Sequence, residues 1–359
     1  MRGEETTVLK SWPGAAGKIL VTVLSICWLF LLISRTSSQS STASEQISAE
    51  TNRLKQTLPS LKLPDDETKQ YADGLKRVET TLQSGYVFLS LYYLYPLRVT
   101  VSTYQYQQSK AEVAKQGNEA FEAEWRSLGQ QLATKEKLLV PEPSQLPAAA
   151  RALAEIALSQ VHPYYQSGRL YGQNTTLENG LFYLGRVPGC LEFALFSQQL
   201  HFTPPRSGLK ARSFEPELAA LEAETLAAYK QTADKDLRPF INVNIAMKMA
   251  TDLNHEKRYF GALLKYLDAS LALKLLTASP PTPDEQTALK KQHAAFGQQL
   301  SSGKTDQSIG LIYWEMAQRA LEPQAEVVIS PEDLKRAAVV ITEVMPRYFK
   351  ATSKVVPKS

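Results

Sequence analysis

The sequence predicts an all-α protein: a helical array or bundle that follows a single hydrophobic segment near the N-terminus. Three observations indicate this class. Apolar side chains recur at steps of three and four, two helix starts carry capping sequences, and most prolines lie between the apolar stripes. Only residues 97–101 and 326–329 are rich in β-branched side chains, and neither run has a hairpin partner.

The clearest apolar stripe starts at Tyr71 and ends at Tyr93. Its members lie three or four residues apart: Tyr71, Leu75, Val78, Leu82, Tyr86, Leu89 and Tyr93. This spacing predicts a helix that turns one apolar face inward. Pro96 is expected to end or kink that helix, because proline has no backbone donor and its ring clashes with the preceding turn. Pro188 is expected to do the same to a later apolar run.

Later stripes predict helices over residues 121–132, 151–162 and 217–232, and a long helix or a helical pair over residues 245–275. Pro163 is expected to stop the second of these helices, for the same reason that applies to Pro96.

Two helix starts are explicit in the sequence. Thr282 and Glu285 form a capping-box pair around Pro283, which suits a first helical turn. Ser330 precedes Pro331 and two acidic residues, which the helix dipole favours at that end.

One window fits the pattern of a tetratricopeptide helical pair, with small residues and one aromatic residue at the expected places. The fitting residues are Ala250, Leu253, Ala262, Tyr266 and Ala269. The next stretch of about 34 residues does not repeat the pattern. An irregular tetratricopeptide-like α-solenoid therefore stays open, beside the ordinary close packing of two helices.

The hydrophobic segment runs from Ile19 to Ile33 without a charged residue; Lys18 precedes it and Arg35 follows shortly after. With a rise of about 1.5 Å per residue, this run covers most of a hydrocarbon layer about 30 Å thick. The segment is predicted to be an uncleaved transmembrane signal anchor. A signal peptide cleaved near Ala43 is the alternative.

Basic residues indicate the orientation of this segment. Arg2, Lys10 and Lys18 lie before it, whereas Arg35 alone lies close behind it. The positive-inside rule therefore places the N-terminus in the cytoplasm and the main domain on the other side. The chain is expected to be a single-pass membrane protein with a non-cytoplasmic body, or a secreted or periplasmic protein if cleavage occurs.

These segments predict the organisation of the whole chain. In order, the expected parts are a short cytoplasmic tail (1–18), the anchor or signal peptide (19–34), a flexible Ser-rich spacer (35–63), a helical region (64–200), a linker (201–216), a second helical region (217–350) and a disordered tail (351–359).

The composition argues against several functions. The net charge is only +4, and basic and acidic residues are interleaved, so no nucleic-acid partner is expected. Cys27 lies in the hydrophobic segment and leaves Cys190 alone, so no disulfide framework is expected. Residues 303–305 (Gly-Lys-Thr) lack the preceding glycine and strand of a phosphate-binding loop. No catalytic residue, cofactor or metal ligand is therefore assigned.

Two groups of tyrosines, the second with one arginine, form the candidate binding surface: Tyr92, Tyr93, Tyr95, Tyr164, Tyr165, Arg169 and Tyr171. Tyrosine joins a large apolar body to a polar tip, which suits ligand grooves and protein interfaces. The same side chains also suit the solvent-facing margin of a helical core, so both interpretations stay open.

We therefore expect a membrane-anchored, extracytoplasmic helical protein that binds or scaffolds another protein. Its partners would be the membrane, through residues 19–33, and a protein of unknown identity. The alternative is an extracytoplasmic all-α enzyme with a dispersed carboxylate site, such as a cell-wall or glycan hydrolase, because such an enzyme needs only one or two acids in a cleft.

Overall fold

The computed structural model describes residues 42–139, 146–202, 209, 212–231, 238–322 and 329–353. The chain divides by its internal contacts into two units, Met1–Ser41 and Thr42–Ser359, and every described residue belongs to the second unit. All elements of the described part are helices and none is a strand, so the all-α prediction is confirmed. The predicted membrane segment and its orientation lie outside the described residues. Within the described ones, no helix combines the length and the hydropathy needed to cross a bilayer.

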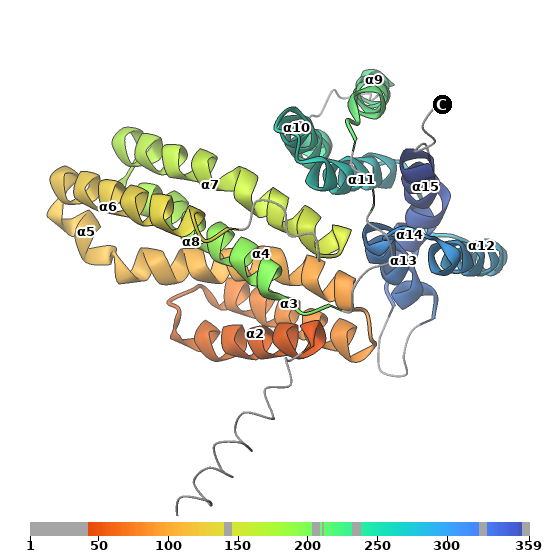
Figure 1. The fold of residues 1–359 in the computed structure, drawn as a ribbon, viewed down its shortest axis with the longest axis horizontal. Coiled ribbons are helices and arrows are strands. Elements are labelled where there is room, and N and C mark those ends of the chain that lie inside the picture. Colours follow the sequence, from red (N-terminus) through yellow and green to blue (C-terminus); the bar gives the residue numbers. More distant parts are fainter. Residues whose placement is uncertain are drawn as a thin grey trace, which may run out of the picture. The chain divides into compact units, whose positions relative to one another are not determined.

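Figure 1 shows the helices of the described part. In chain order they are α2 (Ala43–Thr57), α3 (Asp65–Gln83), α4 (Val87–Ser109), α5 (Ala111–Gln116), α6 (Asn118–Glu136), α7 (Ala148–Asn174), α8 (Leu177–Gln199), α9 (Glu215–Gln231), α10 (Ile241–His255), α11 (Tyr259–Leu275), α12 (Pro283–Ser302), α13 (Ser308–Leu321), α14 (Pro331–Val339) and α15 (Met345–Ser353). Short 3-10 turns at Leu58–Ser60 and Arg238–Phe240 and a π-helical turn at Val340–Val344 join some of them.

The predicted flexible spacer over residues 35–63 is wrong from residue 43 onwards, because α2 occupies most of that span. A capping box between Thr42 and Glu45 starts the helix. Ile47 and Leu54 are buried, and α2 packs on α3 and α4. The apolar face of this helix is narrow, which explains why composition alone suggested a spacer. The predicted tail at 351–359 also starts too early, since α15 continues to residue 353.

The predicted linker at 201–216 is also shorter than expected. Helix α9 begins at Glu215, inside that range. The helices before and after the range belong to one compact unit, because α11 packs on α7 and α13 packs on α4.

The stripe from Tyr71 to Tyr93 lies on two helices, not one. Helix α3 ends at Gln83, and α4 starts at Val87 after a turn in which Gly85 has φ of +82°. A positive φ costs glycine little and other residues more, so Gly85 allows the chain to turn there. The sequence stripe continued through the turn because the two helices bury faces in a common core.

Prolines interrupt fewer helices than expected. Pro96 lies inside α4, Pro163 inside α7 and Pro188 inside α8, and each helix continues past its proline. Pro163 therefore does not stop its helix. Pro96 and Pro163 are exposed, so each proline ring lies on the solvent side of its helix. Burial of the opposite face then outweighs the lost hydrogen bond.

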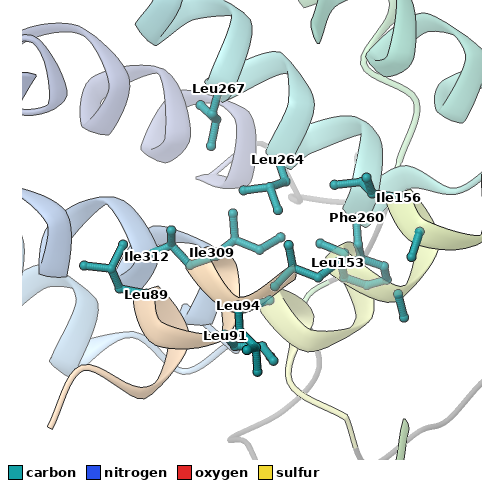
Figure 2. Close-up of a cluster of buried hydrophobic side chains, with 14 of the residues drawn as sticks. Leu89, Leu91, Leu94, Leu153, Ile156, Phe260, Leu264, Leu267, Ile309 and Ile312 are labelled. Atoms are coloured by element: carbon teal, nitrogen blue, oxygen red, sulfur yellow. The ribbon is translucent and has the colours of Figure 1, made fainter. Parts of the chain in front are cut away.

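The core lies where α4, α7, α11 and α13 meet (Figure 2). Leu89 and Leu94 of α4 face Leu153 of α7, Leu264 of α11 and Ile309 of α13, and all five side chains are buried. Residues more than two hundred positions apart in the chain thus share one apolar cluster. Burial of such side chains supplies the main stabilisation of the fold.

Three of these helices receive their N-terminal caps from another helix. The Glu315 carboxylate of α13 accepts a hydrogen bond from the backbone N–H of Leu89 in α4, at 2.8 Å. Glu155 of α7 accepts one from Gly261 in α11, also at 2.8 Å. The N-cap residues of α4 and α11 make no side-chain cap of their own, so these distant carboxylates satisfy amides that would otherwise be unpaired.

The start of α7 is capped in the same way by Asp306, just before α13, and by Ser308, the first residue of α13. Asp306 accepts a hydrogen bond from the backbone N–H of Ala148, and the hydroxyl of Ser308 accepts one from Ala149 at 2.9 Å. These contacts bind the first half of the described chain to the second.

The explicit sequence caps and the expected helical pair are confirmed. Capping boxes start α12 at Thr282 and α14 at Ser330. Residues 245–275 form a packed pair, α10 and α11. Ala250 and Ala262 are buried in that pair, as both the solenoid and the ordinary helix pair require, so the repeat architecture stays a prediction.

Candidate binding groove

The groove lies between α9 and α10. Three residues of α9 are buried and fix its inner face: Leu218, Leu221 and Thr225. The amide oxygen of Asn254 in α10 accepts a hydrogen bond of 2.8 Å from the backbone N–H of Phe214, just before α9 begins. A side chain of α10 therefore satisfies a donor at the start of α9 and holds the two helices together.

Helix α9 is also held from its other side. The Arg347 guanidinium of α15 donates to both carboxylate oxygens of Glu224, at 3.0 and 2.8 Å. Lys274 of α11 lies 3.4 Å from the same carboxylate. Because a bidentate contact of this kind restrains direction as well as distance, α9 is positioned before any partner binds.

The floor of the groove is mostly apolar. The groove consists of two adjoining hollows, and Glu222, Asn244 and Met247 line both of them. The larger hollow, about 490 Å³, extends past Leu218 towards His255. The smaller, about 250 Å³, extends past Leu226, Tyr229 and Phe240. Volumes of a few hundred Å³ are typical of sites that accept large side chains or small ligands.

Large aliphatic side chains remain in solvent in this groove and beside it. Leu226 is 52% exposed and lines it, while Ile241 and Ile245 are 50% and 55% exposed on the adjoining face of α10. Single exposed aliphatic residues are common on soluble proteins, but a group next to an apolar floor is typical of an interaction surface.

The rim of the groove is predominantly acidic. Glu215, Glu222 and Asp252 line it, and Lys248 is paired with Asp252 at 2.6 Å. Three carboxylates and one lysine thus line the groove, so the carboxylates exceed the lysine by two charges. This balance favours a partner with basic side chains beside its apolar ones.

The tyrosines of the first predicted group, Tyr92, Tyr93 and Tyr95, contact different neighbours around α4. The Tyr92 hydroxyl donates to Asp268 of α11 at 3.0 Å, and burial, with the nearby Asp268 charge, raises the pKa of Tyr92 well above its ordinary value. Tyr93 faces Arg77, whose guanidinium carbon lies 5.5 Å from the ring centroid. Tyr95 packs on the other side.

Tyr95 lies against α8. Its ring centroid is 4.8 Å from that of Phe193. Cys190 lies beside it, and burial raises the pKa of that thiol to about 12. Cys190 therefore stays in its neutral form and is part of the packed interior.

The second group connects α6, α7 and α8. Tyr165 stacks on Trp125, with ring centroids 4.9 Å apart, and its hydroxyl donates to the Trp125 carbonyl at 3.1 Å. Arg169 pairs with Glu122 at 3.1 Å. Tyr171 is the most exposed predicted residue, at 39%, and stacks on Tyr183 of α8.

Arg186 of α8 brings part of the two groups together. Its guanidinium donates to the Tyr164 hydroxyl at 3.1 Å and lies over the rings of Tyr164, Phe182 and Tyr183. Its positive charge also lowers the pKa of Tyr95, against the larger effect of burial. Most predicted tyrosines thus make contacts between helices, and their role as a binding surface stays a prediction.

The α9–α10 groove was not predicted from the sequence. A helix was predicted over residues 217–232 from its apolar stripe, and no role was assigned to Leu226. Leu226 lies outside the three-and-four spacing of Leu218, Leu221 and Thr225. An aliphatic residue on the second face of an otherwise amphipathic helix was the available signal.

The buried carboxylates have structural contacts. Glu315, Glu155 and Asp306 accept hydrogen bonds from backbone amides of other helices. Glu50 of α2 lies 3.0 Å from Arg98 of α4. Among the described residues, no group of three or more His, Cys, Asp or Glu side chains is arranged to hold a metal ion.

Comparisons with protein-family models, with curated protein sequences and with solved structures gave no match.

Proposed function

We propose that the chain is a membrane-tethered binding protein whose α9–α10 groove holds an amphipathic helix of a protein partner. The observation that carries this proposal is the combination of exposed Leu226, Ile241 and Ile245 with an apolar floor and an acidic rim. Helix-in-groove recognition uses this combination, because an amphipathic helix presents side chains at spacings of three and four to the floor.

The size of the apolar contribution suits a weak contact. Complete burial of one aliphatic side chain contributes roughly 1.5–3 kcal/mol, and about half of that remains available at each of the three residues. Association itself costs at least several kcal/mol. The acidic rim would then orient the partner and raise its association rate more than it would raise the affinity.

The tether is part of the same proposal. The uncharged run over residues 19–33 and the basic residues before it support an anchor with the body outside the cytoplasm. A tether raises the effective concentration of a groove towards partners on the same membrane surface. A weak groove contact can thereby become sufficient for scaffolding.

Site-specific photo-crosslinking tests the groove in full-length protein. A photoreactive phenylalanine analogue replaces Ile245 or Leu226 in turn, and the crosslinked peptide is identified by mass spectrometry. We expect a discrete adduct from both positions, to a segment with an apolar helical face flanked by Lys or Arg. Leu138, which is 66% exposed at the end of α6, is the matched control position and should give no such adduct.

Charge reversal and a rival surface complete the test. Glu222→Arg should reduce the adduct at Ile245 several-fold, since it replaces attraction at the rim by repulsion. The same photoreactive group at Tyr171 samples the tyrosine surface. An adduct from Tyr171 without one from Ile245 would move the binding site to that surface, and equal adducts at Leu138 would mean unspecific contact.

A further inference from the structure

A second pocket lies where α3, α4, α13 and α14 converge. Three arginines line it, one from each of three helices: Arg77 of α3, Arg319 of α13 and Arg336 of α14. Tyr93 of α4 lies between them, and one wall is apolar. We call this the arginine pocket. It is separate from the groove, with which it shares no residue.

The three guanidinium groups have no carboxylate partner within ion-pair distance among the described residues. Asp333 is the one carboxylate that lines the pocket. It is held by the start of its own helix, where it accepts hydrogen bonds from the Ser330 hydroxyl at 2.7 Å and the Ser330 backbone N–H at 3.1 Å. The lining therefore carries two more positive than negative charges.

The geometry around Tyr93 shows where these charges point. The Arg77 guanidinium lies over the Tyr93 ring, 5.5 Å from its centroid. The positive charges of Arg77, Arg319 and Arg336 all lower the pKa of Tyr93, although burial raises it more. All three charges thus act on one phenolic hydroxyl. Among the described residues, that hydroxyl has no hydrogen-bond partner.

One donor of the pocket is buried and unpartnered. The Nε atom of Arg336 is inaccessible to solvent and has no hydrogen-bond acceptor in the described part of the chain. A buried charged donor without an acceptor is costly, and like charges gathered in one pocket repel one another. A bound anion would remove both costs at once.

We propose that the arginine pocket binds a phosphate group, which the three guanidinium groups hold and to which the Tyr93 hydroxyl donates. Phosphate matches the charge and the donors of these residues better than a carboxylate does. Its tetrahedral oxygens can accept hydrogen bonds from donors on three helices. Its charge near −2 matches the two excess positive charges of the pocket lining. One guanidinium group can satisfy a carboxylate by a bidentate contact. Several arginines around one point are instead typical of phosphate sites.

Calorimetric titration of the full-length protein in detergent micelles tests the proposal, with sodium phosphate at constant ionic strength as the probe. We expect saturable binding to the parent. Arg336→Gln and Arg77→Gln should each weaken it about tenfold or more, because each removes a charge-assisted contact. Arg126→Gln removes an exposed arginine of α6 outside the pocket and should leave the affinity unchanged.

Two further arms sharpen the result. Tyr93→Phe should weaken binding less than the arginine variants, because it removes a neutral donor only. Glycerol 3-phosphate represents a lipid headgroup: tighter binding than inorganic phosphate would identify a lipid source, and weaker binding a free phosphate. Arg77 is exposed, so its replacement tests the pocket even if the Arg336 variant fails to fold.

The absence of saturable binding to the parent would overturn the proposal. Equal affinities for the parent, Arg77→Gln and Arg126→Gln would do so as well, since they would show attraction to the general surface charge. Circular dichroism of each variant establishes that the helical fold is retained.

Discussion

The carboxyl group of Glu315 is buried between α13 and α4. It accepts a hydrogen bond from the Leu89 backbone, and burial nevertheless raises its pKa to about 8. The ordinary pKa of a glutamate is about 4.5. Desolvation therefore disfavours the charged form more than one amide favours it. This residue serves as a cap for another helix and gives the fold a dependence on pH.

Replacement of Glu315 by Gln should remove that dependence. Between about pH 4.5 and 8 the folded chain keeps a proton that the unfolded chain has lost, so stability falls as pH rises through this window. One such proton corresponds to at most about 1.4 kcal/mol per pH unit. Gln has no proton to lose and can still accept from Leu89. We expect Glu315→Gln to flatten the curve of unfolding free energy against pH.

Urea unfolding at pH 5, 6, 7, 8 and 9, followed by circular dichroism, measures this effect. The Gln variant should become more stable than the parent above about pH 8. Glu119→Gln, at an exposed glutamate of α6, is the control and should leave the pH slope unchanged. A parent-like slope in the Glu315 variant would mean that the carboxyl group is already ionised at neutral pH.

At the scale of the element, helix starts follow two rules in this chain. Some caps are local, as at Thr42, Thr282 and Ser330, and each of these is visible as a pair of residues three positions apart. Others come from distant helices, as at the starts of α4, α7 and α11. Local caps determine where a helix begins, and distant ones also determine which helices meet.

Thr282→Ala should destabilise the start of α12. The Thr282 hydroxyl accepts from the backbone N–H of Glu285 at 3.4 Å, and loss of an N-cap of this kind costs about 0.5–2 kcal/mol. Thr287→Ala lies on the same helix at an exposed position and is expected to be neutral or slightly stabilising, because alanine favours the helix. Urea unfolding distinguishes the two variants, and equal midpoints would contradict the local-cap rule.

These two kinds of contact explain how far the sequence could predict the fold. The all-α class and the starts of α12 and α14 follow from local patterns, and so they could be predicted. The passage of α7 through Pro163 depends on burial against other helices, which no local pattern shows. The turn at Gly85 was hidden because Leu82 and Leu89 continue the same spacing across it.

The candidate sites depend even more on tertiary contacts. The arginine pocket joins Arg77 to Arg336, which lie on α3 and α14, far apart in the sequence. No spacing of residues along the chain could indicate such a site. The residues of the groove are closer together in the sequence, since α9 and α10 are consecutive helices. Exposed Leu226 was a usable signal of this groove.

At the scale of the whole molecule, the proposed function requires that the body lies outside the cytoplasm. The groove and the arginine pocket belong to the unit Thr42–Ser359, and the expected anchor precedes it. The proposed orientation places both sites outside the cytoplasm. A reporter within the body can test this orientation without knowledge of the partner.

Asn174 is such a reporter. The triplet Asn174-Thr175-Thr176 is the one Asn-X-Ser/Thr acceptor in the sequence, and Asn174 is exposed at the end of α7. Such an acceptor receives an N-linked glycan only on the translocated side of a secretory membrane. When full-length protein is made in mammalian cells, we expect a slower-migrating form that an N-glycan-cleaving enzyme returns to the original mobility.

The controls follow from the structure around the acceptor. Asn174→Gln should abolish the slower form. Thr176→Ser should keep it, because serine preserves both the acceptor and the cap that Thr176 provides to α8 by accepting from the Asn179 backbone at 3.2 Å. Ala120→Thr creates a second acceptor at exposed Asn118 and should add a second shift. If neither position is modified, the body stays in the cytoplasm, and the proposed orientation is wrong.

If the glycosylated protein also stays with the membrane after alkaline carbonate extraction, residues 19–33 act as an uncleaved anchor; its release would instead indicate cleavage near Ala43.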